Sequence, residues 1–326
     1  MAQNNTRNRI SNLSDSLLCH ILSFLPTIEA VATSLLSSRW KTVWTLVPNL
    51  YFDVDGIETI SNSSSSDQCH VTFAQILFRV WALRNVNCVQ KFRLKGQYLD
   101  SDSIDIDSCV RAVIARDVEH IHLNIGHDEP LKMPCSLFIC KTLVVLKLKD
   151  HSETSDHGIW AWDFIGALFN VKYLHLYQYT TQCLIFSSDL DPPMFYNLVC
   201  LNFHYCCKWH ALPLVLQRSP NLETLVCQWT HCCHLGRSAS GNIRINEPHT
   251  VPECLSSQLT TFNFEGFVWA EDELEVVRYI LKNARFLKKL TITSSLPDSD
   301  VKLHLLKELL VFPKCSSKCK IAFVYN

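Results

Sequence analysis

Glycine, net charge and long apolar runs are all scarce in this 326-residue sequence, which holds only 8 glycines and has a formal net charge of −1. So few glycines, none of them in a phosphate-loop pattern, argue against a nucleotide-binding enzyme. The near-zero charge gives no bulk attraction for nucleic acids or anionic membranes, so we expect neither as a partner. With 48% hydrophobic and 19% charged residues, the composition is that of a folded globular chain.

A membrane span and a signal peptide are not expected either. No run of about 18 apolar residues occurs, and the amino-terminal residues are polar. A cytoplasmic or nuclear location follows as an expectation. In such a reducing compartment the 16 cysteines are expected to be free and mostly buried thiols, and not a disulfide framework.

Residues 9–52 contain more apolar surface than so short a segment can bury by itself. Their apolar residues recur at helical spacing. The pattern predicts one helix within Ser14–Pro26, a second that Thr27 caps, and a third that contains Trp40 and Trp44. Three short helices share only a small core, so part of this surface is expected to dock against the rest of the chain or a partner.

A second pattern, apolar-x-x-apolar-x-apolar, recurs eight times at intervals of 24 to 37 residues. These hexads begin at Val89, Val118, Leu143, Val171, Leu198, Leu222, Leu259 and Leu287. Most intervals match the length of leucine-rich repeats, in which each hexad forms a short strand and the intervening residues return along the outer side. The pattern predicts a curved parallel sheet, with chance leucine spacing in an ordinary α/β domain as the alternative.

The fifth residue of each hexad and the residue two positions beyond it are expected to line the concave side of this sheet. They form a partly basic and partly aromatic row, which is the best candidate for a groove that binds a target protein. The predicted substrate-binding residues are Arg93, Lys147, Lys149, His175, Tyr177, Asn202, His204 and Gln228. The alternative is an ordinary solvated sheet face.

Catalytic, cofactor and metal sites are not predicted. Three clusters could suggest such chemistry: Ser38–Lys41 as a hydrolase S-x-x-K motif, His231–His234 with Cys206, Cys207 and His210 as zinc ligands, and the pair Cys315 and Cys319. The first lacks the companion motifs of its enzyme class. The adjacent cysteines of the second lack the usual ligand spacing, and free thiols are favoured for the third. A metal-dependent or thiol enzyme would have to depend on these clusters alone.

The amino-terminal segment resembles the F-box. The matching residues are Arg9-Ile10-Ser11, Leu17-Leu18, Ile21 to Pro26, Ala30-Val31, Arg39-Trp40, Trp44 and Val47-Pro48. This resemblance implies contact with a Skp-type adaptor and, through it, a cullin-based ubiquitin ligase. By the same resemblance, the residues that form or support the adaptor-facing surface are Leu17, Ile21, Leu22, Leu25, Pro26, Val31, Leu35, Trp40 and Trp44.

The carboxyl-terminal part resembles the FBD domain of plant F-box/LRR-repeat proteins. Matching segments include Glu253-Cys254-Leu255, Val277 to Ala284, Leu287 to Leu290 and Leu306 to Leu310. Helices are expected at Glu271–Asn283 and Asp300–Leu310, and a strand at Lys320–Tyr325, which together would cap the open end of the repeats.

The expected fold class is therefore α/β: a three-helix F-box, an irregular leucine-rich-repeat solenoid and an FBD cap. The expected boundaries are 9–55 for the F-box, 56–70 for a linker, 71–251 for the repeats and 252–326 for the FBD domain. The resemblance implies a non-catalytic substrate-recognition subunit of an SCF-type (Skp–cullin–F-box) ubiquitin ligase. A recruitment scaffold of the same fold without ligase assembly is the alternative, because Leu13-Ser14-Asp15 stands where the family usually has Leu-Pro-Asp.

Overall fold

The computed structural model describes the chain in segments. The described residues are 10–55, 73–84, 88–96, 106–126, 137, 140–150, 170–177, 181, 194–205, 211–229, 250–294, 307 and 309–325. The predicted linker lies outside them, as does most of the helix expected at Asp300–Leu310.

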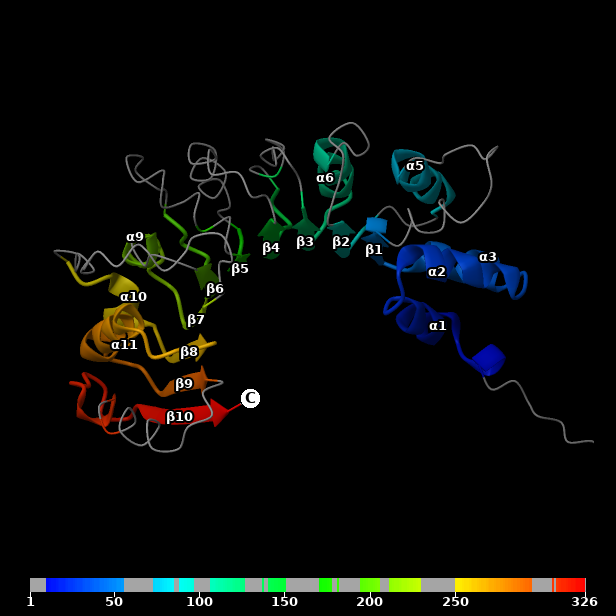
Figure 1. Ribbon diagram of the computed structural model, residues 1–326. Coiled ribbons are helices and arrows are strands. Elements are labelled where there is room, and N and C mark those ends of the chain that lie inside the picture. The colour runs from blue at the N-terminus through cyan, green and yellow to red at the C-terminus, as the bar shows by residue number, and fades with distance from the viewer. Residues whose placement is uncertain are drawn as a thin grey trace, which may run out of the picture.

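Short helices form the amino-terminal end of the molecule (Figure 1). They are η1 (Ile10–Asn12), α1 (Asp15–Leu22), α2 (Thr27–Ala32), η2 (Thr33–Leu35), α3 (Trp40–Val43) and η3 (Trp44–Leu46). The Ser14 hydroxyl caps α1 by accepting a hydrogen bond from the Leu17 amide. Thr27 does not cap α2, contrary to expectation. It is the first helical residue, and its hydroxyl accepts from the Tyr51 amide at 2.8 Å, which ties α2 to the first strand.

A single ten-stranded sheet forms the rest of the framework, with every neighbouring pair parallel and the strands in chain order. The strands are β1 (Asn49–Asp53), β2 (Lys91–Gly96), β3 (His120–Ile125), β4 (Val145–Asp150), β5 (Tyr173–Leu176), β6 (Cys200–Tyr205), β7 (Thr224–Trp229), β8 (Thr261–Glu265), β9 (Lys289–Ser294) and β10 (Lys320–Tyr325). The eight hexads supply β2 to β9, and the strand expected at Lys320–Tyr325 is β10. The α/β solenoid is therefore confirmed, and β1 adds a strand that was not predicted.

The core consists of two apolar ladders that run across all the strands. The residues of the first ladder are Leu50, Phe92, Ile121, Leu146, Leu174, Leu201, Leu225, Phe262, Leu290 and Ile321. The second ladder lies two residues further along each strand, from Phe52 and Leu94 to Phe264 and Ile292. From β1 to β9 these side chains are buried. They are the fourth and sixth positions of each hexad, so the repeat spacing itself specifies the core.

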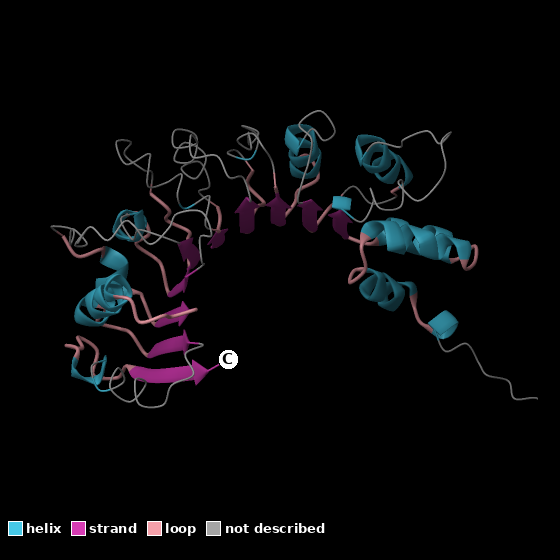
Figure 2. Ribbon diagram, viewed as in Figure 1, coloured by secondary structure: helices cyan, strands magenta, loops and turns pink. Residues whose placement is uncertain are grey.

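Helices cover only the outer side of the sheet (Figures 1 and 2). They are α5 (Phe73–Leu83), α6 (Ile106–Ile114), α9 (Ala211–Gln217), α10 (Glu253–Ser257) and α11 (Glu271–Asn283), the last with the bounds expected from the sequence. Helices need about 8–10 Å between axes, whereas strands need about 4.8 Å, so the outer layer takes more room and the sheet curves inward. The strands consequently line a concave face. Among the described residues, no helix is long and apolar enough to cross a membrane.

The start of α11 is fixed by Glu273, a carboxylate with no solvent exposure. Its Oε2 atom accepts hydrogen bonds from the amides of Val268 and Ala270, at 3.0 and 3.1 Å. The carboxylate thus satisfies backbone donors at the helix amino terminus, where negative charge is favoured. This contact ties the first turn of α11 to the segment that leads into it from β8.

Candidate docking surface and concave face

Exposed apolar side chains are concentrated in the amino-terminal helices. Leu35 is 88% exposed, Phe24 74% and Leu36 68%, while Leu17 and Ile21 on α1 are 51% and 44% exposed. We call these five residues the apolar surface. Large side chains left in water on a short helical segment are typical of a region that binds another protein.

The residues predicted to face an adaptor separate into three groups. Leu17, Ile21 and Leu35 are exposed and belong to the apolar surface. Leu25, Pro26, Val31 and Trp40 are partly buried. Leu22 and Trp44 are only 2% and 5% exposed and pack in the core of the chain, so they can support a docking surface without touching a partner.

Phe24 and Leu36 were missed in the sequence. Each lies next to a residue that the F-box resemblance selects, Leu25 or Leu35, but was not selected itself. Both are large apolar residues within the segment that resembles the F-box, and that is the signal that could have found them.

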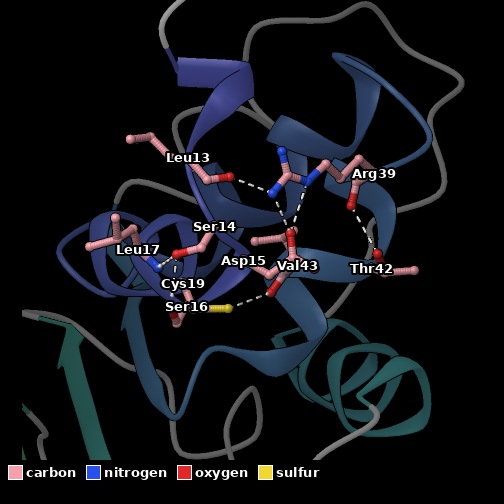
Figure 3. Close-up of polar contacts among 9 residues, drawn as sticks. All are labelled: Leu13, Ser14, Asp15, Ser16, Leu17, Cys19, Arg39, Thr42 and Val43. Atoms are coloured by element: carbon pink, nitrogen blue, oxygen red, sulfur yellow. Dashed lines mark hydrogen bonds and ion pairs between the residues drawn. The ribbon is translucent and has the colours of Figure 1, made fainter.

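Arg39 joins the first and third helices (Figure 3). Its Nε and Nη2 atoms donate to one carboxylate oxygen of Asp15, at 2.8 and 2.6 Å, and Nη2 also donates to the Leu13 carbonyl. Nearby, the Cys19 thiol donates to the Val43 carbonyl at 3.4 Å. These contacts link residues 24 to 26 positions apart and hold α1 against α3.

The predicted groove residues share one face of the sheet. Arg93, Lys147, His175 and Asn202 lie in a single row across β2, β4, β5 and β6. In the next row, His204 pairs with Gln228, and Lys149 is two residues beyond Lys147 on β4. Tyr177 directly follows β5. Because side chains alternate between the two faces of a strand, all these positions face away from the buried ladders and toward the concave side.

Aromatic rings and cations alternate along this face. The Arg93 guanidinium lies 4.6 Å from the centroid of the Tyr51 ring, and the Lys149 ammonium lies 5.7 Å from that of Tyr177. The Tyr177 ring stacks on His204, with centroids 4.2 Å apart. Cation–π contacts of this kind orient a charged side chain while leaving its hydrogen-bond donors available.

Three histidines on this face have low pKa values. Burial lowers the pKa of His122, His175 and His204 to about 4, and the neighbouring positive groups add to the effect. The pKa of His122 is lowered further by Arg93, Lys147, His175 and Lys149, and the pKa of His175 by Lys147. At neutral pH these histidines are therefore uncharged, and the positive charge of the face belongs to arginine and lysine.

Not every cation here is free of a partner. The Lys95 ammonium donates to Asp53 at 2.8 Å, with Asp55 at 3.9 Å, and the hydrogen bond to Asp53 raises the pKa of Lys95.

Asn202 Oδ1 and His204 Nδ1 are buried atoms with no hydrogen-bond partner. Such atoms are expected to pair with water or with a ligand.

Most of the cysteine and histidine clusters considered as metal or thiol sites fall outside the part of the chain that the structure describes. Cys206, Cys207, His210 and His231–His234 lie outside the described residues. Cys315 is exposed and Cys319 partly buried, in a stretch without regular helix. Within the segments that the structure describes, no group of three histidine, cysteine, aspartate or glutamate residues could hold a metal ion.

Comparison with known proteins matches both ends of the chain. The F-box domain model matches residues 10–52 and the FBD model residues 247–292. Two F-box/FBD/LRR-repeat proteins of Arabidopsis thaliana are each 27% identical to this chain, covering 98% of it and 94% and 95% of their own length. An FBD-associated F-box protein of the same plant is 24% identical, with 98% of both chains covered. The chain therefore carries matches to an F-box domain and to an FBD domain, and over nearly its whole length it is similar to F-box/FBD/LRR-repeat proteins of Arabidopsis thaliana.

Proposed function

We propose that this chain is the substrate-recognition subunit of an SCF-type ubiquitin ligase. In this role the F-box binds a Skp-type adaptor, which connects the chain to a cullin, and the concave face binds a target protein. The observation that carries the proposal is the apolar surface, which lies within the residues that the F-box model matches. It gives a partner several large apolar anchors, the kind of contact that dominates binding energy at interfaces.

In this proposal the chain performs no bond chemistry itself. It raises the effective concentration of a target near ubiquitin that another subunit carries, and it sets the target's orientation. The continuous parallel sheet supports this role, because β1 follows directly after the F-box helices and pairs with β2. A stiff connection between the two binding regions would fix the direction in which a target is presented. The cytoplasm or nucleus is the proposed location, since ubiquitin ligases of this type act there.

The test is co-purification with a co-expressed Skp-type adaptor. We expect the parent chain to retain the adaptor and the double variant Leu35→Ser, Leu36→Ser to lose it, with unchanged thermal unfolding because both side chains are exposed. Phe78→Ser is the matched control: Phe78 is 72% exposed on α5, outside the F-box, and its loss should leave adaptor binding intact. The proposal is overturned if the adaptor does not co-purify with the parent chain, or if it co-purifies equally well with the double variant.

Two further measurements sharpen this test. Leu22→Ala should lower the stability of the folded chain by about 2–5 kcal/mol because it leaves a cavity in the core, so it reports on folding and not on docking. Recovery of a cullin together with the adaptor separates a ligase subunit from the alternative, a scaffold that binds an adaptor without ligase assembly.

A further inference from the structure

Most of the positive charge at the described concave positions of the sheet is on β2 and β4, and Lys289 on β9 and Lys320 on β10 are the other cations there. The cationic residues facing this side on β2 and β4 are Lys91, Arg93, Lys95, Lys147 and Lys149. Among the described concave positions of β2 to β6 there is no acidic residue. Asp53 on β1 and Asp55 just after it pair with Lys95, and among the described strand positions of this face the next acid is Glu265, on β8. The chain as a whole carries a net charge of −1, so this positive region is local.

The histidines between these cations make the region more selective. His122 lies between Arg93 and Lys147 in the row that crosses the strands, and His175 follows Lys147 in the same row, on β5. Being neutral at pH 7, they add hydrogen-bonding atoms without adding charge. The unpartnered atoms of Asn202 and His204 extend this polar surface onto β6. A ligand that lies across these strands would contact the cations of β2 and β4 and the neutral polar side chains of β3, β5 and β6.

We propose that the concave face from β2 to β6 binds an acidic segment of the target protein, an extended peptide whose carboxylates pair with Arg93, Lys147 and Lys149. This inference deepens the proposed function, and it rests on that function for the repeats being the part that binds the target. Electrostatic complementarity of this kind selects partners and speeds their association more than it adds affinity.

The spacing of the cations favours carboxylates distributed along a chain. Arg93 and Lys147 are separated by one intervening strand, which places their backbones about 10 Å apart. A single phosphate would be better held by cations converging on one point, as in bidentate arginine sites. Nucleic acid binding depends on many phosphate contacts, which a chain with this net charge does not offer broadly. Uncharged acceptors beside the cations also suit a peptide, whose backbone supplies N–H donors.

The experiment measures fluorescence anisotropy of labelled peptides with the full chain, purified with its adaptor at physiological ionic strength. The probes are poly-glutamate, poly-glutamine of equal length, a phosphoserine peptide of equal length and a single-stranded oligonucleotide. We expect poly-glutamate to bind more tightly than the other three, and added salt to weaken it. Lys147→Gln and Lys149→Gln should each reduce its affinity by roughly two- to fivefold, the range for exposed ion pairs.

Lys289→Gln is the matched control. Lys289 is on the same side of the sheet but on β9, outside the positive region, so its replacement should leave the affinity unchanged. The proposal is overturned if poly-glutamate binds no better than poly-glutamine, if the phosphoserine peptide or the oligonucleotide is preferred, or if Lys289→Gln weakens binding as much as Lys147→Gln. Adaptor co-purification with the Lys147 and Lys149 variants reports on the F-box separately, so failure of one proposal is distinguishable from failure of the other.

Discussion

Arg84, at the end of α5, donates a hydrogen bond of 2.7 Å to the carbonyl of Val47, at the end of the F-box helices. The same guanidinium donates to the Cys88 carbonyl at 3.3 Å, just before β2. Burial, together with the nearby Arg116, lowers the pKa of Arg84 to about 10, so it remains charged at neutral pH. One side chain thus fastens the F-box, the first outer helix and the first repeat strand to one another.

Replacing this guanidinium should weaken the junction. Arg84→Met keeps much of the apolar stem but leaves the Val47 carbonyl without its charged donor, so we expect a loss of about 1.5–3 kcal/mol in the free energy of unfolding. Urea denaturation of the full chain measures it. Arg79→Met, on the exposed side of the same helix, is the control and should change stability little. Equal stability of the two variants would show that the junction does not depend on Arg84.

The contact between Arg39 and Asp15 gives a second prediction. Asp15→Ala removes an ion pair whose side chains are 56% and 38% exposed, so it should cost only about 0.2–1 kcal/mol. Arg39→Ala should cost more, because it also removes the hydrogen bond to the Leu13 carbonyl. Chemical denaturation of both single variants and of the double variant gives the coupling energy.

Lys41→Ala provides the control for this pair, since Lys41 is an exposed cation on α3 with no part in the Arg39 contact. It should unfold like the parent. A cost for Asp15→Ala equal to that of Arg39→Ala would mean that the Leu13 carbonyl contact contributes nothing to stability.

The parallel sheet could be predicted from sequence because its core is specified locally. In every hexad the same three positions are apolar, and in the structure each strand begins at the third residue of its hexad. β1 obeys the same rule, since Val47, Leu50 and Phe52 have the hexad spacing and are buried. These residues also belong to the segment that resembles the F-box, and the predicted repeats begin only at Val89, so this strand was not expected from the sequence. β10 has Lys318 at the corresponding first position, which is why it was predicted as a separate strand and not as a repeat.

Residue exposure on the helices could not be predicted in the same way. A helical period identifies an apolar face but does not say whether the chain or a partner covers it. Leu18 and Leu22 have no more distinctive sequence context than Leu17 and Ile21, yet the first two are buried against Val43 and its neighbours and the second two are exposed. The hydrogen bonds of Arg39 and Thr27, which position these helices, have partners 24 residues away in the sequence and so leave no local pattern.

The histidines of the concave face predict a loss of stability in mild acid. The groups concerned are His122, His175 and His204, which face Arg93 on β2, Lys147 and Lys149 on β4, and Tyr177. Their pKa values are about 4 in the folded chain against about 6.5 when unfolded, so the unfolded chain binds more protons between these values. The free energy of unfolding should therefore be fully retained above about pH 6.5 and decrease as the pH falls toward 4.

Thermal unfolding measured from pH 7.5 to 4.5 tests this expectation, with His175→Gln as the informative variant and His20→Gln as its control. His175→Gln removes one titrating group from the face, so its melting temperature should fall less steeply with decreasing pH than that of the parent. His20 is exposed on α1, far from the positive rows, and its variant should follow the parent curve. Added poly-glutamate should flatten the curve as well, because a bound acidic peptide would offset the positive charge that disfavours protonation of these histidines. Parallel curves for the parent and His175→Gln would show that the burial of His175 beside Lys147 does not contribute to the acid sensitivity of the chain.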